Sequence, residues 1–225
     1  MSIIVYSRKE RSKLKAYLDK IREPDKSISA RRENIITVGI VVFGFLIGIV
    51  QKALDGTAIN ELPFILQQID IINFFGRLAI WILLAVIISV YAKTPARASV
   101  NTFLFFISMV AGYYIYCNFV LGFLPRSYMM MWFAISVVSV VPAYICWYAK
   151  GDGPIAVIIT AGILGVLLAQ SVIITQGIYV THLPDAVLWI IGMIVLRRKP
   201  KEFAVAVLLS IAVAFIYQTF IPYWG

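Results

Sequence analysis

The sequence predicts an all-α fold, a polytopic bundle of about seven transmembrane helices, on three observations. The chain of 225 residues is 61% hydrophobic, has a mean hydropathy of +0.90, and is only 14% charged, about half the share usual in soluble domains. Long apolar runs recur along it, each near the ~20 residues that cross a bilayer. The basic residues between these runs gather on one side of the predicted bundle. We therefore expect a multi-pass protein of the cell membrane.

The distribution of positive charge predicts the orientation. Of the 20 Lys and Arg residues, 17 lie in the segment 1–34 and in three short connections, 93–97, 150–153 and 197–201. The other three are Lys52, Arg77 and Arg126. Connections rich in Lys and Arg are retained in the cytoplasm. The N-terminus is therefore predicted inside and, after seven spans, the C-terminus outside, with anionic lipid headgroups facing the basic side.

Residues 1–34 form a basic leader that we expect in the cytoplasm as an amphipathic helix. It carries ten Lys and Arg against five Asp and Glu. The run Ser7–Glu10 has the spacing of a capping box, and Pro24 ends the helical pattern. One apolar stripe at i, i+3, i+4 and i+7 consists of Leu14, Tyr17, Leu18 and Ile21. Two arrangements follow: a helix bound to the surface of the inner leaflet, or a solvated helix that only sets the topology.

The residues 35–225 are predicted to form the transmembrane helical domain. Its seven spans are Ile35–Leu54, Ile71–Tyr91, Ser99–Phe119, Tyr128–Tyr148, Pro154–Thr175, Tyr179–Leu196 and Phe203–Ile221. The sixth span (about 179–196) is the least regular, because polar residues and a proline within 181–185 interrupt its outer end; whether it crosses the membrane fully is left open. Pro142 is expected to kink the fourth span, since proline cannot donate a helical hydrogen bond.

The residues on which most enzyme chemistry depends are missing. His182 is the only histidine, so a zinc site built on several histidines cannot form. The chain has no Gly-x-Ser-x-Gly elbow and no glycine-rich phosphate loop. No Asp or Glu lies in the middle of a predicted span, which argues against a paired-carboxylate protease. We therefore expect a non-enzymatic protein with no cofactor and no metal. Nucleic acid is not an expected partner, because the basic residues are spread among apolar runs.

Polar side chains gather in the outer halves of the predicted spans and in their outer turns. Amides and a guanidinium are costly in hydrocarbon, so these groups should face the bundle interior or water. One interpretation is an outward-facing polar vestibule. Its candidate ligand-binding residues are Asp70, Arg77, Tyr113, Tyr114 and Gln170. The alternative is that the same side chains extend to the outer headgroups and hydrogen-bond between helices.

Arg77 is the central residue of the vestibule hypothesis. It lies six residues into the second span, about 9 Å along a helix at 1.5 Å per residue. Asp70 precedes it by seven positions, on roughly the same helical face. An arginine at this depth requires a carboxylate, an anionic ligand or a lipid phosphate. The sequence thus predicts either a polar site around Arg77 or a side chain that extends to lipid.

Gly44 and Gly48 form a GxxxG step in the first span, where small residues let a neighbouring backbone approach closely. The neighbour is either another helix of this chain, or a partner protein or second copy of the chain. Both readings keep these glycines as helix-packing residues.

Several short motifs lie in the stretch 61–150 and after the sixth predicted span. They are Glu61-Leu-Pro-Phe64, Ala79-Ile-Trp81, Ser89-Val-Tyr91, Ser127-Tyr-Met-Met130, Cys146-Trp-Tyr-Ala-Lys150 and Lys199-Pro-Lys-Glu-Phe203. On these motifs the chain resembles an uncharacterised family of small polytopic membrane proteins of Gram-positive bacteria. The resemblance implies a bacterial membrane protein and transfers no catalytic residue. The long outer segment and small-residue step of the first span also resemble vitamin-binding subunits of energy-coupling-factor transporters, which have six spans.

Two functions follow. The first is a membrane protein that binds or transports a small molecule through the outward-facing vestibule. The alternative is an accessory or assembly subunit that docks a membrane partner, or forms a homo-oligomer, through its first span and basic leader. The lipid bilayer is a partner in both.

Overall fold

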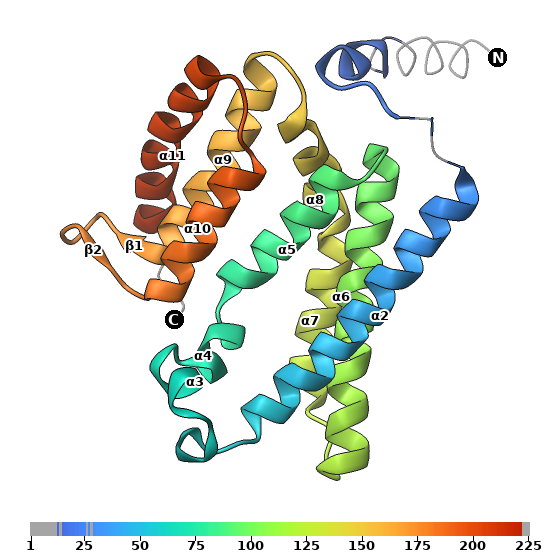
Figure 1. Ribbon diagram of the computed structural model, residues 1–225, viewed down its shortest axis with the longest axis vertical. Coiled ribbons are helices and arrows are strands. Elements are labelled where there is room, and N and C mark those ends of the chain that lie inside the picture. The colour runs from blue at the N-terminus through green and yellow to red at the C-terminus, as the bar shows by residue number, and fades with distance from the viewer. Residues whose placement is uncertain (1–12, 14, 26, 28, 222–225) are drawn as a thin grey trace.

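The computed structural model describes residues 13, 15–25, 27 and 29–221 and confirms the all-α helical bundle (Figure 1). Its elements are α2 (Ala30–Asp55), η1 (Ile59–Glu61), α3 (Phe64–Gln68), α4 (Ile71–Gly76), α5 (Leu78–Tyr91), α6 (Pro95–Val120), α7 (Arg126–Val138), α8 (Val140–Trp147), η2 (Tyr148–Lys150), α9 (Pro154–Ser171), β1 (Val172–Ile173), β2 (Tyr179–Val180), α10 (Leu183–Val195) and α11 (Pro200–Phe220). The predicted capping box at Ser7–Glu10 and the residue Leu14 lie outside the described residues.

The chain is a helical membrane protein. Four continuous helices, α2, α6, α9 and α11, and the helical segment Arg126–Lys150 are 18 to 26 residues long and apolar enough to cross a bilayer. The shorter apolar helices α5 and α10 correspond to the second and sixth predicted spans. Large apolar side chains remain exposed along these helices, as at Val38, Val42 and Leu46 of α2. Such exposure is expected where the solvent is lipid. The number of crossings and their direction stay predictions.

The sixth predicted span is shorter than the sequence suggests. Residues 179–180 form β2, which pairs antiparallel with β1 through Val172–Val180 and Ile173–Tyr179. The helix α10 begins only at Leu183, with Pro184 in its first turn, where a missing N–H costs nothing. Its 13 residues extend about 20 Å, less than the roughly 30 Å of a hydrocarbon core. The fifth span is shortened by the same hairpin and ends at Ser171 instead of Thr175.

The second predicted span is not one continuous helix. The helix α4 ends at Gly76, Arg77 is extended (φ −83°, ψ 156°), and α5 begins at Leu78. The break removes a helical partner from the carbonyl of Phe75. Two side chains replace it, since Trp81 Nε1 donates to that oxygen at 2.9 Å and Gln51 Nε2 at 3.3 Å. The expectation that Arg77 lies within a helix is therefore corrected: it connects two helices.

Pro142 disturbs the fourth span as the sequence predicts. The helix is interrupted at Ser139, between α7 and α8, three residues before the proline. Proline donates no hydrogen bond to the carbonyl four residues earlier, which here belongs to Val138. The Ser139 hydroxyl donates to Ser136 O at 2.7 Å within the distorted turn.

Two helical layers flank a centre formed by α5 and α8 (Figure 1). On one side α2 packs along α6, and on the other α9 packs along α11, with α10 against α9. The central α5 contacts both sides and contributes Leu83 and Val86 to a core shared with Leu164 and Leu167 of α9. The fold therefore holds its most buried apolar layer between α5 and α9.

Gly44 and Gly48 lie directly against α6. A Cβ atom on Gly48 would collide with the carbonyl oxygen of Met109, and one on Gly44 would collide with Phe105 O and the Ser108 hydroxyl. From the facing helix, Gly112 approaches the backbone of Phe45. The small-residue step is thus occupied by a helix of the same chain.

The end of the leader packs onto the bundle, an arrangement that neither sequence interpretation included. Ile21 is 8% exposed, and its backbone oxygen accepts a hydrogen bond from Asp152 N at 2.8 Å. The Arg22 guanidinium lies 4.1 Å above the Trp147 ring and donates to Trp147 O and Val90 O. These contacts attach the leader to the end of the bundle where α5 and α8 finish. Tyr17, by contrast, is 54% exposed.

The carboxylate of Asp25 contributes a pH-dependent part of this attachment. A hydrogen bond from Lys93 Nζ at 2.7 Å, followed by two from Ser27, holds the pKa of Asp25 well below its usual range. A carboxyl group whose pKa is lower in the folded state stabilises fully above its unfolded value, near 4, and less as the pH falls below it. We therefore expect Asp25→Asn to lower the thermal midpoint at pH 7, with a smaller difference at pH 3. Equal differences at both pH values would contradict this.

Candidate functional site

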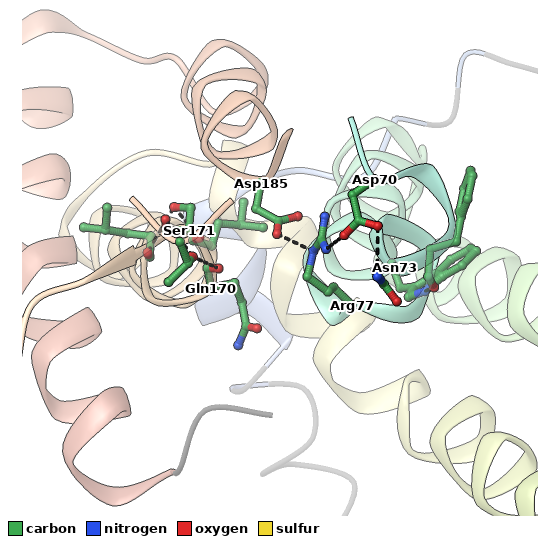
Figure 2. A network of polar contacts seen from close by, with 11 residues as sticks. Asp70, Asn73, Arg77, Gln170, Ser171 and Asp185 are labelled. Atoms are coloured by element: carbon green, nitrogen blue, oxygen red, sulfur yellow. Dashed lines mark hydrogen bonds and ion pairs between the residues drawn. The ribbon is translucent and has the colours of Figure 1, made fainter. Parts of the chain in front are cut away.

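Three charged side chains meet where α4, α5 and α10 come together (Figure 2). Arg77 Nε lies 2.6 Å from Asp185 Oδ2, and Arg77 Nη1 donates to Asp70 Oδ2 at 3.4 Å. Asp70 also accepts a hydrogen bond from Asn73 Nδ2 at 2.9 Å. We call Asp70, Arg77 and Asp185 the charged triad. It joins the break in the second span to the first turn of α10.

The local backbone places each member of the triad. Asp70 adopts a left-handed conformation (φ 51°) at the start of α4, which aspartate tolerates better than most residues. Arg77 occupies the extended residue between α4 and α5. Asp185 lies in the first turn of α10, where the helix dipole favours a negative charge.

The triad is deeply buried and contains more negative than positive charge. Arg77 is 7% exposed and Asp185 only 1%, whereas the Asp70 side chain is 35% exposed. Arg77 Nε and Asp185 Oδ2 form an ion pair without the alignment of a hydrogen bond, and among the described residues Arg77 Nη2 and Asp185 Oδ1 have no hydrogen-bond partner. Two carboxylates already face the guanidinium, so an anionic ligand would be repelled. The geometry suits a link between helices better than an anion site.

A second charged cluster lies at the C-terminal end of α2. Lys52 is 8% exposed, and its Nζ lies 2.5 Å from Asp55 Oδ2. The ammonium group also lies above two aromatic rings, 5.2 Å from the centroid of Tyr113 and 5.7 Å from that of Phe123. Rings at these distances attract a cation through their electron-rich faces. The cluster thus holds a largely buried positive charge, and the carboxylate that it pairs with, Asp55, is half exposed.

A cavity of about 370 Å³ opens beside this cluster; we call it the Lys52 cavity. Its wall includes Lys52, Asp55 and Tyr113, together with Gln51 of α2 and Tyr128 of α7. It therefore combines one ammonium group, one carboxylate, an amide and two phenols with aromatic surface. Small-molecule sites use such polar groups to orient a ligand, and this wall is nearly as polar as it is apolar.

The five predicted ligand-binding residues are distributed over three places. Asp70 and Arg77 lie together in the triad, as the sequence suggests. Tyr113 lines the Lys52 cavity, and Tyr114 lies beside it on α6 with its ring centroid 5.2 Å away. Gln170 of α9 donates instead to the hydroxyl of Tyr217 at 3.1 Å. Figure 2 shows Gln170 on the opposite side of Asp185 from Arg77.

Two residues of the charged clusters were not singled out from the sequence. Asp185 counted among the polar side chains at the predicted outer side and as an interruption of the sixth span, but it was not recognised as the carboxylate that Arg77 requires. Lys52 counted only as an outer cation, because its distance from Tyr113 in the sequence conceals their contact. Among the described residues, no three His, Cys, Asp or Glu side chains gather in a way that could hold a metal ion.

Comparison with known proteins assigns no function to the chain, so the functional interpretation rests on the geometry of the site. No family model matches the chain, and neither a curated protein nor a solved structure resembles it significantly.

Proposed function

We propose that the protein is a non-enzymatic membrane protein that binds a small anionic molecule with an aromatic or apolar body in the Lys52 cavity. The observation that carries this proposal is the environment of Lys52, a buried ammonium group beside two rings and one half-exposed carboxylate. A carboxylate ligand would take the place of Asp55 on Lys52, and its apolar body would pack on Tyr113, Phe123 and Tyr128. Displaced from Lys52, the Asp55 side chain can turn to water.

The orientation belongs to the same proposal. Ile21 and Arg22 of the basic leader attach where α5 and α8 finish, whereas Lys52 lies in the last turn of α2, at the end of that helix farther from the leader (Figure 1). If the basic side faces the cytoplasm, the Lys52 cavity opens on the outside. It then replaces the triad as the ligand-binding part of the predicted vestibule.

The alternative role as an assembly subunit receives less support from the structure. The close-approach surface of Gly44 and Gly48 is covered by α6, and Ile21 and Arg22 of the leader are engaged with the bundle. A partner or second copy would have to bind the remaining face of α2, whose exposed apolar residues are equally suited to lipid.

The proposal is tested with phenylacetate as the probe, measured by titration calorimetry on the purified chain in detergent. We expect wild type to bind phenylacetate and not phenethylamine, which has the same ring and the opposite charge. Lys52→Gln should weaken binding about tenfold or more, since hydrogen bonds to charged groups contribute about 1.5–3 kcal/mol. Arg126→Gln, which removes a cation of an outer turn, is the matched control and should bind as wild type does. Equal affinity of the Lys52→Gln variant would refute the proposal.

A further inference from the structure

A second cavity lies between α5, α6, α7 and α8. Its volume is about 470 Å³, and its wall is almost entirely apolar, with Trp81, Phe106, Met131 and Ile135 among its residues. The few hydroxyl groups there are already bonded: Ser89 and Thr102 to each other, at 3.1 Å, and Ser139 to the backbone. We call it the apolar groove. Its lining residues on α7 include exposed side chains such as Met131 and Ile135, so the groove is open toward the surrounding hydrocarbon.

A narrow aromatic gap lies next to both cavities. Its wall shares Gln51, Tyr113 and Tyr128 with the Lys52 cavity and shares Trp132 with the apolar groove. The rings form a row, since Tyr128 lies 5.9 Å from Tyr113 and 6.0 Å from Trp132 between centroids. The Lys52 cavity and the apolar groove are thus neighbours, and each shares wall residues with the gap.

Two residues that line this gap each carry a buried polar atom with no hydrogen-bond partner in the described part of the chain. The hydroxyl of Tyr114 and Nε1 of Trp132 lack a hydrogen bond among the described residues, although the two side chains are only 7% and 8% exposed. An unsatisfied buried donor is costly and uncommon in folded proteins. Both residues line the gap. A ligand whose polar end reaches the gap could accept hydrogen bonds from both atoms. The two unpartnered donors therefore indicate a ligand with a polar end, which an apolar groove by itself would not require.

We propose that the ligand is a single-chain anionic amphiphile, a long-chain carboxylate. Its carboxylate binds Lys52 with the hydroxyl of Tyr114 and the indole N–H of Trp132 close by, and its chain passes through the gap into the apolar groove. The inference rests on the proposed function and deepens it by naming the class of ligand. The gap, with room for about one water molecule, is too narrow for two chains, and one chain passes only where the rings of Tyr113, Tyr128 and Trp132 move apart.

Fluorescence quenching tests this inference, because Trp81 and Trp132 line the groove. The probe is 9,10-dibromostearate, whose bromine atoms quench tryptophan on contact, added at low mole fraction to the full chain in maltoside micelles. We expect saturable quenching in wild type. Ala134 is an exposed residue of α7 that lines the groove, so Ala134→Phe fills the groove with a ring and should raise the half-saturation concentration about tenfold. Lys52→Gln, which removes the partner of the carboxylate, should raise it by about the same factor. Ala204→Phe, at an exposed position of α11, is the matched control and should behave as wild type does.

Phenylacetate separates a failure of the inference from a failure of the proposed function. One outcome is that phenylacetate binding still requires Lys52 while dibromostearate quenches all variants equally and without saturation. In that case the alkyl chain of the probe lies only in the micelle. The inference is then overturned, and the proposed function stands. Quenching that is weakened by Ala134→Phe but not by Lys52→Gln would mean that the groove binds the apolar chain without recognising its carboxylate. That result also overturns the inference. Preferential quenching by a dibrominated phosphatidylglycerol would assign the groove to a two-chain lipid, against the inference.

Discussion

Replacement of Arg77 by leucine is expected to destabilise the protein more than any other single change considered. Truncating one partner of a desolvated ion pair typically costs about 3–5 kcal/mol, because the remaining charge stays buried without compensation. Here Asp185, at 1% exposure, would lose the one ion-pair partner that it has among the described residues, and Asp70 would lose one as well. Thermal unfolding of wild type and Arg77→Leu in one detergent measures the effect, with a large fall of the midpoint as the expected result.

Three further variants show whether charge burial is the cause. Arg77→Lys should recover only part of the stability, since lysine lacks the planar fork that faces two carboxylates from one side chain. Asp185→Asn added to Arg77→Leu should restore much of the loss, because it removes the uncompensated charge. Arg126→Leu, at an outer turn, should change little. Indistinguishable midpoints for wild type, Arg77→Lys and Arg77→Leu would mean that the triad contributes nothing to the fold.

Gly48→Leu is expected to have the second largest effect. Even a Cβ atom at this position would collide with the carbonyl of Met109, so α2 and α6 would have to separate. Overpacking of this kind costs typically about 1–3 kcal/mol, and a displaced backbone is less adaptable than a side chain. The thermal midpoint in detergent and the yield of monodisperse protein should both fall.

Gly39→Leu is the matched control for the glycine prediction. Gly39 lies on the same helix, and a Cβ atom there would meet nothing within 4 Å. We expect wild-type stability from this variant. If Gly48→Leu were tolerated and instead dissociated a copurifying partner, the glycine step would serve assembly and not the internal contact with α6.

The predicted second span shows how far the sequence could be interpreted. Its apolar residues predicted a helix over residues 71–91, and most of that range is helical. The break at Arg77 was not predicted, because it depends on Trp81 and Gln51. Their side chains donate hydrogen bonds to the carbonyl oxygen of Phe75. Gln51 is 24 residues from Phe75, so local periodicity contains no sign of that bond. The pairing of Arg77 with Asp70 could be expected from the sequence, because the two residues are seven positions apart. The tighter pairing with Asp185 could not, because it joins two different spans that lie far apart in the sequence.

The Lys52 cavity illustrates the same limit. The sequence marked Tyr113 and Tyr114 as polar groups at the outer end of a span, and both line the cavity or its gap. That Tyr113 meets Lys52 depends on the packing of α2 along α6, and that packing depends in turn on glycines that let the backbones approach.

By itself the sequence determined that this is an all-α membrane protein with a basic leader and long apolar helices. Those properties depend on composition and on the length of apolar runs, which are local and set by transfer of side chains between water and lipid. Only the tertiary structure decided that Arg77 is shared by two carboxylates, that Gln170 belongs to another helix pair, and that Lys52 faces aromatic rings. Contacts between distant residues follow from how helices pack, and in lipid that packing depends on shape and on a few buried polar bonds instead of on hydrophobicity.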